Sequence, residues 1–134
     1  ANFMLPRFRE ICEAIMLLKE HPSRTVRSAI ISLLPELAAY CPESFARVYL
    51  SEAIDMLMKG TSNKDLRAQS LLALGRMSLS IGHHPFFQKR TNELASVVRT
   101  NLASDLSKAE VHTKVHIHMH AYIYIYIHTG YIRT

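Results

Sequence analysis

Apolar side chains recur at helical spacing along residues 23–41, and the rest of the chain can be interpreted around this stretch. The apolar positions are 26, 29, 30, 33, 34, 37, 38 and 41. This is the i, i+3, i+4, i+7 pattern of a helix with one buried face. Ser23 or Thr25 is expected to cap the start of the helix, and Pro35 predicts a bend inside it.

The same pattern returns 40 residues later, since Val26-Arg27-x-Ala29 is echoed by Leu66-Arg67-Ala68. Moving the apolar positions by 40 gives 66, 69, 70, 73, 74, 77, 78 and 81, and five of these eight are apolar. Helix pairs of the HEAT and armadillo type repeat at roughly 40–47 residues. We therefore predict that the two stretches are the second helices of successive repeats.

Four further helices are predicted from the same periodicity, at about residues 7–19, 43–58, 64–81 and 86–103. Gly60 is expected to end the third helix of the chain, with Ser62 or Asn63 as the next cap. Gly75 is expected to allow close packing of a neighbouring helix. The predicted fold is an all-α solenoid of HEAT-type antiparallel helix pairs, about two and a half repeats. Its segment covers 1–104, followed by a low-complexity tail at 105–134 that is irregular or disordered.

The tail changes character from residue 111, where histidine or tyrosine alternates with valine, isoleucine or methionine. This alternation favours a strand locally, although no partner strand is predicted. Residues 122–127 carry no charge and no proline, which is typical of an aggregation-prone segment. The alternation also matches a translated dinucleotide repeat. We interpret the tail as read-through into non-coding sequence or as a gene-model error.

The charge pattern favours solvated helix faces over a nucleic-acid arm. The net charge is +5 and the isoelectric point is near 9.4, but the basic residues are scattered among acids. Two cysteines, Cys12 and Cys41, fall on apolar helix faces and are expected to be free thiols in a reducing compartment. No apolar stretch reaches the roughly 18 residues of a membrane helix.

Candidate chemistry is sparse. The tail histidines at 116, 118 and 120 would share one face of a strand, as metal ligands do, but no cysteine or carboxylate completes a site. The pair His83-His84 is expected to belong to a turn. Asp65 and Arg67 are interpreted as structural pairing between stacked repeats rather than as ligand contacts. The sequence therefore predicts no catalytic, cofactor-binding or metal-ligating residues, no cofactor, and no enzyme activity for this chain.

Several helices resemble one family more specifically. Arg7-Phe8-Arg9-Glu10-Ile11-Cys12, Ser32-Leu33-Leu34-Pro35-Glu36-Leu37-Ala38 and Leu72-Ala73-Leu74-Gly75-Arg76-Met77 resemble, in that order, the N-terminal HEAT solenoid of the target-of-rapamycin (TOR) serine/threonine kinases. The resemblance covers residues 2–104. It implies a piece of a longer protein that acts as a protein-interaction scaffold in nutrient and growth signalling.

The same resemblance implies TOR-complex subunits or neighbouring HEAT repeats as partners, and a cytoplasmic location with the nucleus as the alternative. The kinase domain of that family lies far downstream, so no catalytic residue carries over to this chain. The alternative function is a generic HEAT- or armadillo-like binding module for an acidic partner or nucleic acid. Steep salt dependence of binding would favour nucleic acid, because phosphate contacts weaken with salt.

Overall fold

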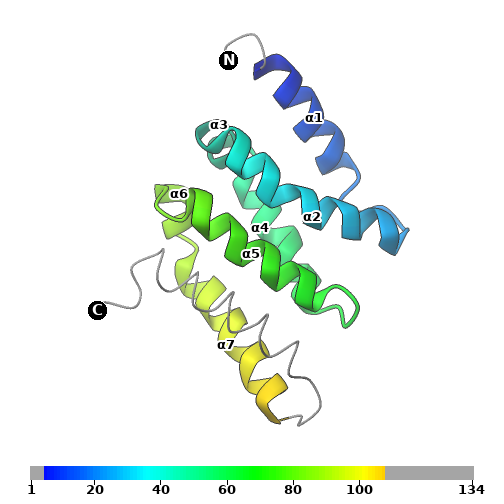
Figure 1. The fold of residues 1–134 in the computed structure, drawn as a ribbon, viewed down its shortest axis with the longest axis vertical. Helices are drawn as coiled ribbons and strands as arrows, with labels where there is room; N and C mark the ends of the chain where they lie inside the picture. Colours follow the sequence, from blue (N-terminus) through cyan, green and yellow to red (C-terminus); the bar gives the residue numbers. More distant parts are fainter. Residues whose placement is uncertain (1–4, 108–134) are drawn as a thin grey trace.

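The computed structural model describes residues 5–107, which form α-helices joined by short turns (Figure 1). The helices are α1 (Leu5–Leu17), α2 (Arg24–Tyr40), α3 (Pro42–Val48), α4 (Leu50–Thr61), α5 (Arg67–Ile81), α6 (Pro85–Gln88) and α7 (Thr91–Ser107). The predicted all-α solenoid is confirmed for this range. The tail histidines and the predicted strand lie outside the described residues.

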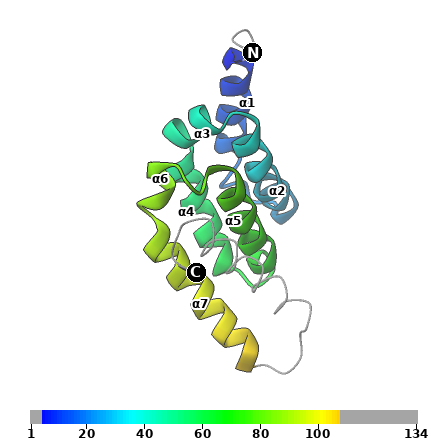
Figure 2. The ribbon, with the colours of Figure 1, turned by 60° about the vertical axis from the view of Figure 1, so that its left-hand side comes forward.

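The helices stack in two layers. In both views α2 and α5 run side by side, and α4 lies behind them in Figure 1 and to their left in Figure 2. The second helices of two successive repeats therefore form one layer. The first helices, which are α1, α3 with α4, and α6 with α7, form the other. This is the arrangement that the 40-residue echo predicts.

The predicted buried face of α5 is confirmed. The eight positions of the shifted pattern are Leu66, just before the helix, and seven positions within it. All eight are buried except Gln69, which is half-buried. In α2 the predicted face is partly wrong, because Ala29 and Leu33 are exposed. Ile31 and Pro35 are buried instead. The buried stripe of α2 is thus rotated from the one expected.

The first helices are interrupted where the sequence predicts continuous ones. The helix expected at 43–58 is divided at Tyr49 into α3 and α4. Tyr49 is buried, and its hydroxyl donates to the Arg9 carbonyl oxygen at 3.5 Å. Val48, the last residue of α3, is 55% exposed. The helix expected at 86–103 is divided in the same way into α6 and α7.

The roles predicted for the turn between α4 and α5 are only partly correct. Gly60 does not end α4 but lies buried in its last turn against Ser70 of α5. Asn63 caps a turn rather than the helix, since its Oδ1 accepts from the Asp65 N–H at 2.9 Å and α5 begins four residues after Asn63. The predicted cap of α2 is confirmed, because the Ser23 hydroxyl accepts from the Val26 N–H at 3.4 Å.

Candidate protein-binding site

A line of polar contacts joins the second helices of the two repeats. Arg24 Nη1 of α2 lies 2.7 Å from Asp65 Oδ2, just before α5. The Gln69 amide donates to the Ser28 carbonyl oxygen and to the Ser32 hydroxyl, and its oxygen accepts from the Ser28 hydroxyl at 2.7 Å. The prediction that Asp65 pairs between repeats is confirmed.

Arg67 does not take part in this line. Its Nε donates to the Thr61 carbonyl oxygen at 2.9 Å, so it secures the end of α4 within its own repeat. This contact satisfies one of the carbonyl groups that a helix C-terminus leaves without an intrahelical partner. Asp65 and Arg67 thus both have structural partners, as the sequence suggests, although only Asp65 reaches the preceding repeat.

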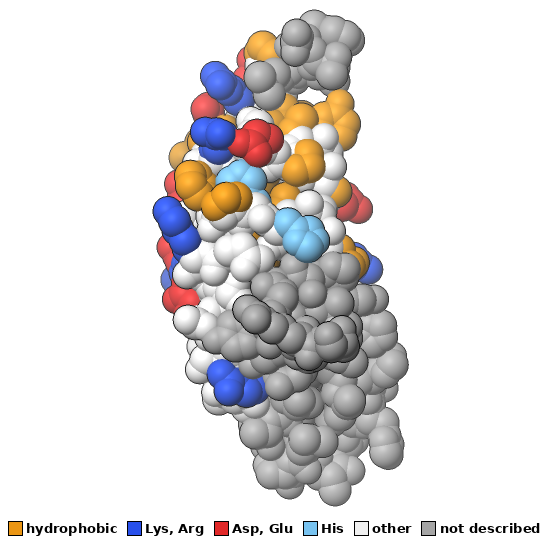
Figure 3. Space-filling view, turned by 90° about the vertical axis from the view of Figure 1, so that its left-hand side faces the viewer, with side chains coloured by type: hydrophobic (Ala, Val, Ile, Leu, Met, Phe, Trp, Pro, Cys, Tyr) orange, Lys and Arg blue, Asp and Glu red, His pale blue; other side chains and the backbone are white. Residues whose placement is uncertain are grey.

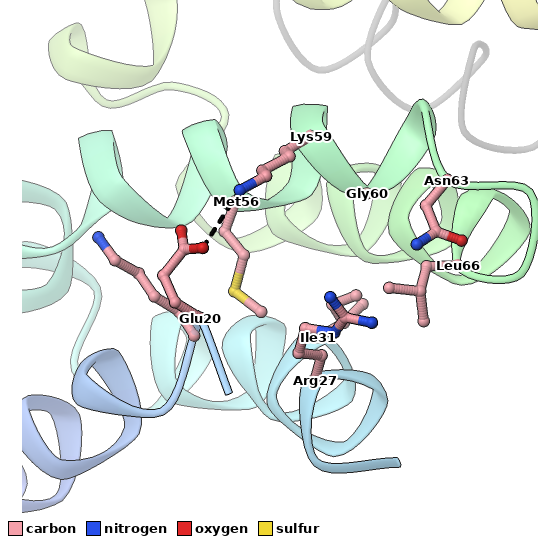
Figure 4. Close-up of a pocket in the computed structure, with 9 residues that line it drawn as sticks. Glu20, Arg27, Ile31, Met56, Lys59, Gly60, Asn63 and Leu66 are labelled. Atoms are coloured by element: carbon pink, nitrogen blue, oxygen red, sulfur yellow. Dashed lines mark hydrogen bonds and ion pairs between the residues drawn. The ribbon is translucent and has the colours of Figure 1, made fainter. Parts of the chain in front are cut away.

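A small cavity of about 70 Å³ opens between α2, α4 and the turn after α1 (Figure 4). Ile31, Met56 and Leu66 give it apolar walls. Arg27 of α2 also lines it, and the Nε atom of Arg27 is buried without a hydrogen-bond partner among the described residues. The site therefore combines an apolar surface with a buried cationic donor for which the described residues offer no acceptor.

Two ion pairs lie at the rim of this cavity. Lys59 Nζ of α4 lies 3.2 Å from Glu20 Oε2, across the cleft from the turn after α1 (Figure 4). Lys19 Nζ lies 2.9 Å from Glu52 Oε2. These pairs are largely exposed, so each contributes little to stability, but they fix where positive and negative charge lie around Arg27.

The predicted turn histidines have one clear structural role. His84 Nδ1 accepts from the Phe86 N–H at 3.2 Å and so caps α6, while its Nε2 lies 3.2 Å from Glu43 Oε2 of α3. Arg47 donates to the same Glu43 carboxylate at 2.5 Å, and this hydrogen bond lowers the pKa of Glu43. His84 therefore connects α6 to α3.

The remaining candidate chemistry concerns the two cysteines and possible metal ligands. Cys12 is fully buried, and this burial raises the pKa of its thiol to about 11, so it is not a reactive thiolate at neutral pH. Both cysteines are free. Within residues 5–107 no three His, Cys, Asp or Glu side chains gather closely enough to hold a metal ion. None of the helices in that range has the length and continuous apolar character that a membrane crossing requires.

Three large apolar side chains on and just after α1 are exposed, among exposed charged residues such as Arg7, Glu10 and Glu13. Ile11, Leu17 and Leu18 are 51%, 84% and 41% exposed. The opposite face of α1 packs inward through Phe8, Cys12 and Met16. A first helix of a solenoid ordinarily buries both faces between neighbouring repeats. Within residues 5–107, these three apolar side chains therefore lack the cover that a neighbouring repeat would give.

Sequence reasoning missed the Arg27 cavity. Arg27 belongs to the Val-Arg opening that identifies the repeat, but it also lies one helical turn before Ile31, on the stripe of α2 that is buried. An arginine at the start of a buried stripe is the signal that could have indicated a cationic cleft. The error in assigning the buried face of α2 hid this signal.

Comparison with curated proteins shows similarity to a single kind of protein in three organisms. The chain is 32% identical over 81 residues to the serine/threonine-protein kinase TOR of Oryza sativa subsp. japonica, and 34% identical over 77 residues to that of Arabidopsis thaliana. It is 24% identical over 115 residues to the serine/threonine-protein kinase tor1 of Schizosaccharomyces pombe. The chain is homologous to a segment of TOR kinases.

These matches cover 60%, 58% and 84% of this chain but only 3%, 3% and 5% of the respective TOR kinases. The chain thus spans a very small part of the length of its TOR relatives, and their catalytic domain is not among its 134 residues. No family model matches the chain. No solved structure matches it either.

Proposed function

We propose that this chain is a protein-interaction scaffold, a HEAT-repeat segment related to the N-terminal solenoid of a TOR-type kinase. Its partners are TOR-complex subunits or neighbouring HEAT repeats. The observation that carries the proposal is the group of exposed apolar side chains Ile11, Leu17 and Leu18, which lie on α1 and on the first residue after it. Such a group indicates an interaction surface, because stacked repeats bury their apolar faces only against neighbours.

The similarity to TOR kinases supports the same proposal and adds its setting. A segment of this kind would act in nutrient and growth signalling in the cytoplasm. On this proposal residues 1–104 form the interaction segment and the tail at 105–134 takes no part in binding, although α7 extends into the first residues of that range, to Ser107. The chain would contribute binding surface, while catalysis would belong to the kinase domain of the longer relatives.

The charge distribution argues against nucleic acid as the partner. Basic side chains from several helices are paired with acids: Lys19 with Glu52, Arg24 with Asp65, Arg47 with Glu43, Lys59 with Glu20, and Arg90 with Asp55 and Glu93. On the face in Figure 3, Lys and Arg side chains lie interspersed with Asp and Glu. Nucleic-acid sites gather positive charge on one face instead.

Surface plasmon resonance tests the proposal with the full chain immobilised. The analytes are purified TOR-complex accessory subunits, the segment of the rice kinase that precedes the matched region, and duplex DNA. We expect binding of a protein analyte that changes little between low and high salt. The double variant Ile11→Ser/Leu17→Ser should weaken this binding at least tenfold, since it removes the two large apolar side chains that α1 exposes.

Val48→Ser is the matched control, because Val48 is an apolar residue that is 55% exposed on a different helix, α3. This variant should bind as the unchanged chain does. Binding of duplex DNA that falls steeply with salt, together with no binding of either protein analyte, would replace the scaffold function by nucleic-acid binding.

A further inference from the structure

A hollow of about 300 Å³ lies where α3, α4 and α6 meet. Its lining consists of two buried apolar residues, one exposed aromatic ring, one serine and three cations: Ala46, Leu50, Phe86, Ser51, Arg47, Lys89 and Arg90. These seven residues include no aspartate and no glutamate. None of them belongs to α1, so this α3–α6 hollow is separate from the exposed apolar side chains described above.

Two donors of the α3–α6 hollow can be reached from solvent. The Arg47 side chain is 67% exposed, and its described hydrogen bond runs from Nε to Glu43, which leaves the two Nη groups for another acceptor. Lys89 is exposed, and its Nζ lies 5.1 Å from the centre of the Phe86 ring. Phe86 itself is 40% exposed. An accessible cation and an accessible apolar ring therefore lie together.

The three cations differ in how far they are neutralised. Arg90 is paired twice, through Nη2 with Asp55 Oδ1 at 2.6 Å and through Nε with Glu93. Lys89 has no carboxylate within ion-pair distance among the described residues. An entering anion therefore gains most beside Lys89. Because the carboxylates on Arg90 and Arg47 would repel a chain of phosphates, a single carboxylate suits this site better than a polyanion.

The Phe86 ring supplies the apolar part of the site. Lys89 Nζ lies over the ring, and the His84 ring stands at 71° to it with centroids 5.2 Å apart. These contacts take up part of the ring, so an aliphatic side chain fits the remaining surface better than a planar base, which needs a whole open face. On the face in Figure 3, hydrophobic side chains lie between Lys and Arg side chains and beside a histidine.

We propose that the α3–α6 hollow binds an acidic segment of a partner protein in which aspartate or glutamate lies next to leucine or another aliphatic residue. One carboxylate pairs with the Lys89 ammonium, a second accepts from the Nη groups of Arg47, and the aliphatic side chain packs on the Phe86 ring. A volume of about 300 Å³ is at the lower end for a binding site and accommodates side chains of one short segment. This proposal rests on the protein-binding function proposed above and adds a second surface.

The test is a nuclear magnetic resonance titration of the full chain at low salt with four peptides that share one glycine-serine-rich sequence. Their central residues are Glu-Leu-Leu-Glu, Gln-Leu-Leu-Gln, Glu-Ser-Ser-Glu, and Leu-Leu between two phosphoserines. The first peptide should shift the backbone amide signals of Ser51, Lys89 and Arg90. Its affinity should exceed that of the second and the third by at least about fivefold, because each of these lacks one of the two required contacts.

Lys89→Gln and Phe86→Ser should each weaken binding of the first peptide by about fivefold, because the first change removes the charge and the second removes the ring. Lys64→Gln is the matched control for charge, since Lys64 is an exposed lysine in the turn before α5. Leu79→Ser is the control for apolar surface, since Leu79 is 48% exposed on α5. Both controls should bind within about twofold of the unchanged chain. Circular dichroism checks that the helices of all four variants remain.

Three results would overturn the site. Equal losses in the variants and their controls would show diffuse attraction, and no shift with any peptide at millimolar concentration would show that the hollow takes no such segment. Tighter binding of the phosphoserine peptide would assign the hollow to a phosphorylated partner. Ile11→Ser/Leu17→Ser should leave the peptide affinity unchanged. If Lys89→Gln and Phe86→Ser bind the peptides and a TOR-complex subunit as the unchanged chain does, the proposed site fails while the scaffold function stands.

Discussion

Gly60 of α4 lies directly against Ser70 of α5, so a Cβ atom on residue 60 would come within 3.1 Å of the Ser70 Cβ and closer still to its hydroxyl oxygen. Both residues are buried. The hydroxyl could turn aside by rotating about χ1, but the Ser70 Cβ cannot move without shifting α5. This contact therefore sets how closely the two helices of the second repeat approach.

Gly60→Ala should destabilise the fold by about 1–3 kcal/mol through overpacking. This outweighs the roughly 1 kcal/mol that alanine gains over glycine inside a helix. Urea unfolding followed by circular dichroism measures the change. In the background of Ser70→Ala the same substitution should remain destabilising but less so, since the hydroxyl is gone. A Gly60→Ala chain more stable than the original would show that α4 and α5 are not in close contact.

Gln69→Ala should lower the free energy of unfolding by about 1–2 kcal/mol, because three hydrogen bonds to Ser28 and Ser32 are lost at a half-buried position. Arg24→Ala provides the comparison. Its ion pair with Asp65 is 61% and 58% exposed, so its removal should cost less than about 1 kcal/mol, and less again in high salt. Equal effects of the two variants in urea unfolding would contradict this ranking.

Stability should fall at alkaline pH because of Cys12. Folding raises the pKa of its thiol from 9.0 to about 11, chiefly through burial. The folded state thus holds this proton more tightly than the unfolded chain does. The stabilising contribution is complete below pH 9 and is lost as the pH rises to about 11.

Urea unfolding under reducing conditions at several pH values measures this loss. In Cys12→Ala the decline across the same pH range should be smaller by an amount on the order of 1–3 kcal/mol. The cavity that alanine leaves lowers the free energy of unfolding of the variant by the same amount at every pH. Only the pH dependence of the two chains is therefore compared. Parallel curves for the two chains would show that Cys12 does not titrate differently on folding.

His84→Ala should destabilise the chain by about 1 kcal/mol, because α6 loses the side chain that caps it and α3 loses a contact at Glu43. His84→Asn should recover part of this loss, since asparagine accepts from the Phe86 N–H in the same way. Thermal unfolding of the original chain and the two variants gives their order of stability. If asparagine and alanine behave alike, the cap at this position contributes nothing measurable.

The sequence predicts the repeat better than it predicts each helix. The face of α5 follows from its alignment with the first stretch rather than from its own composition, since α5 buries Ser70 and Ser78 and leaves Leu79 48% exposed. In α2 apolar residues occupy most of the circumference, and Leu33 competes with Ile31 for burial. Periodicity alone cannot decide which of two adjacent apolar stripes of α2 is buried. Packing against α4 and α5 decides it.

The interruptions of the first helices have no local signal. Neither glycine nor proline lies near Tyr49, where α3 ends and α4 begins. The break arises from tertiary packing, since the Tyr49 ring is buried and its hydroxyl reaches the Arg9 carbonyl on α1. The shape of the Arg27 cavity could not be predicted from α2 alone, because its walls also come from α4, Leu66 and the turn after α1.

The hydrogen bonds of Gln69 have a geometric consequence. The Gln69 side chain of α5 forms hydrogen bonds with both Ser28 and Ser32, which lie one turn apart on α2. Sliding α5 along α2 in either direction would break all three bonds together, so these bonds oppose small shifts as strongly as large ones. The offset between successive second helices determines the pitch of a superhelix. The side chain of Gln69 thus fixes the offset between α2 and α5, and with it the rise of the superhelix from one repeat to the next.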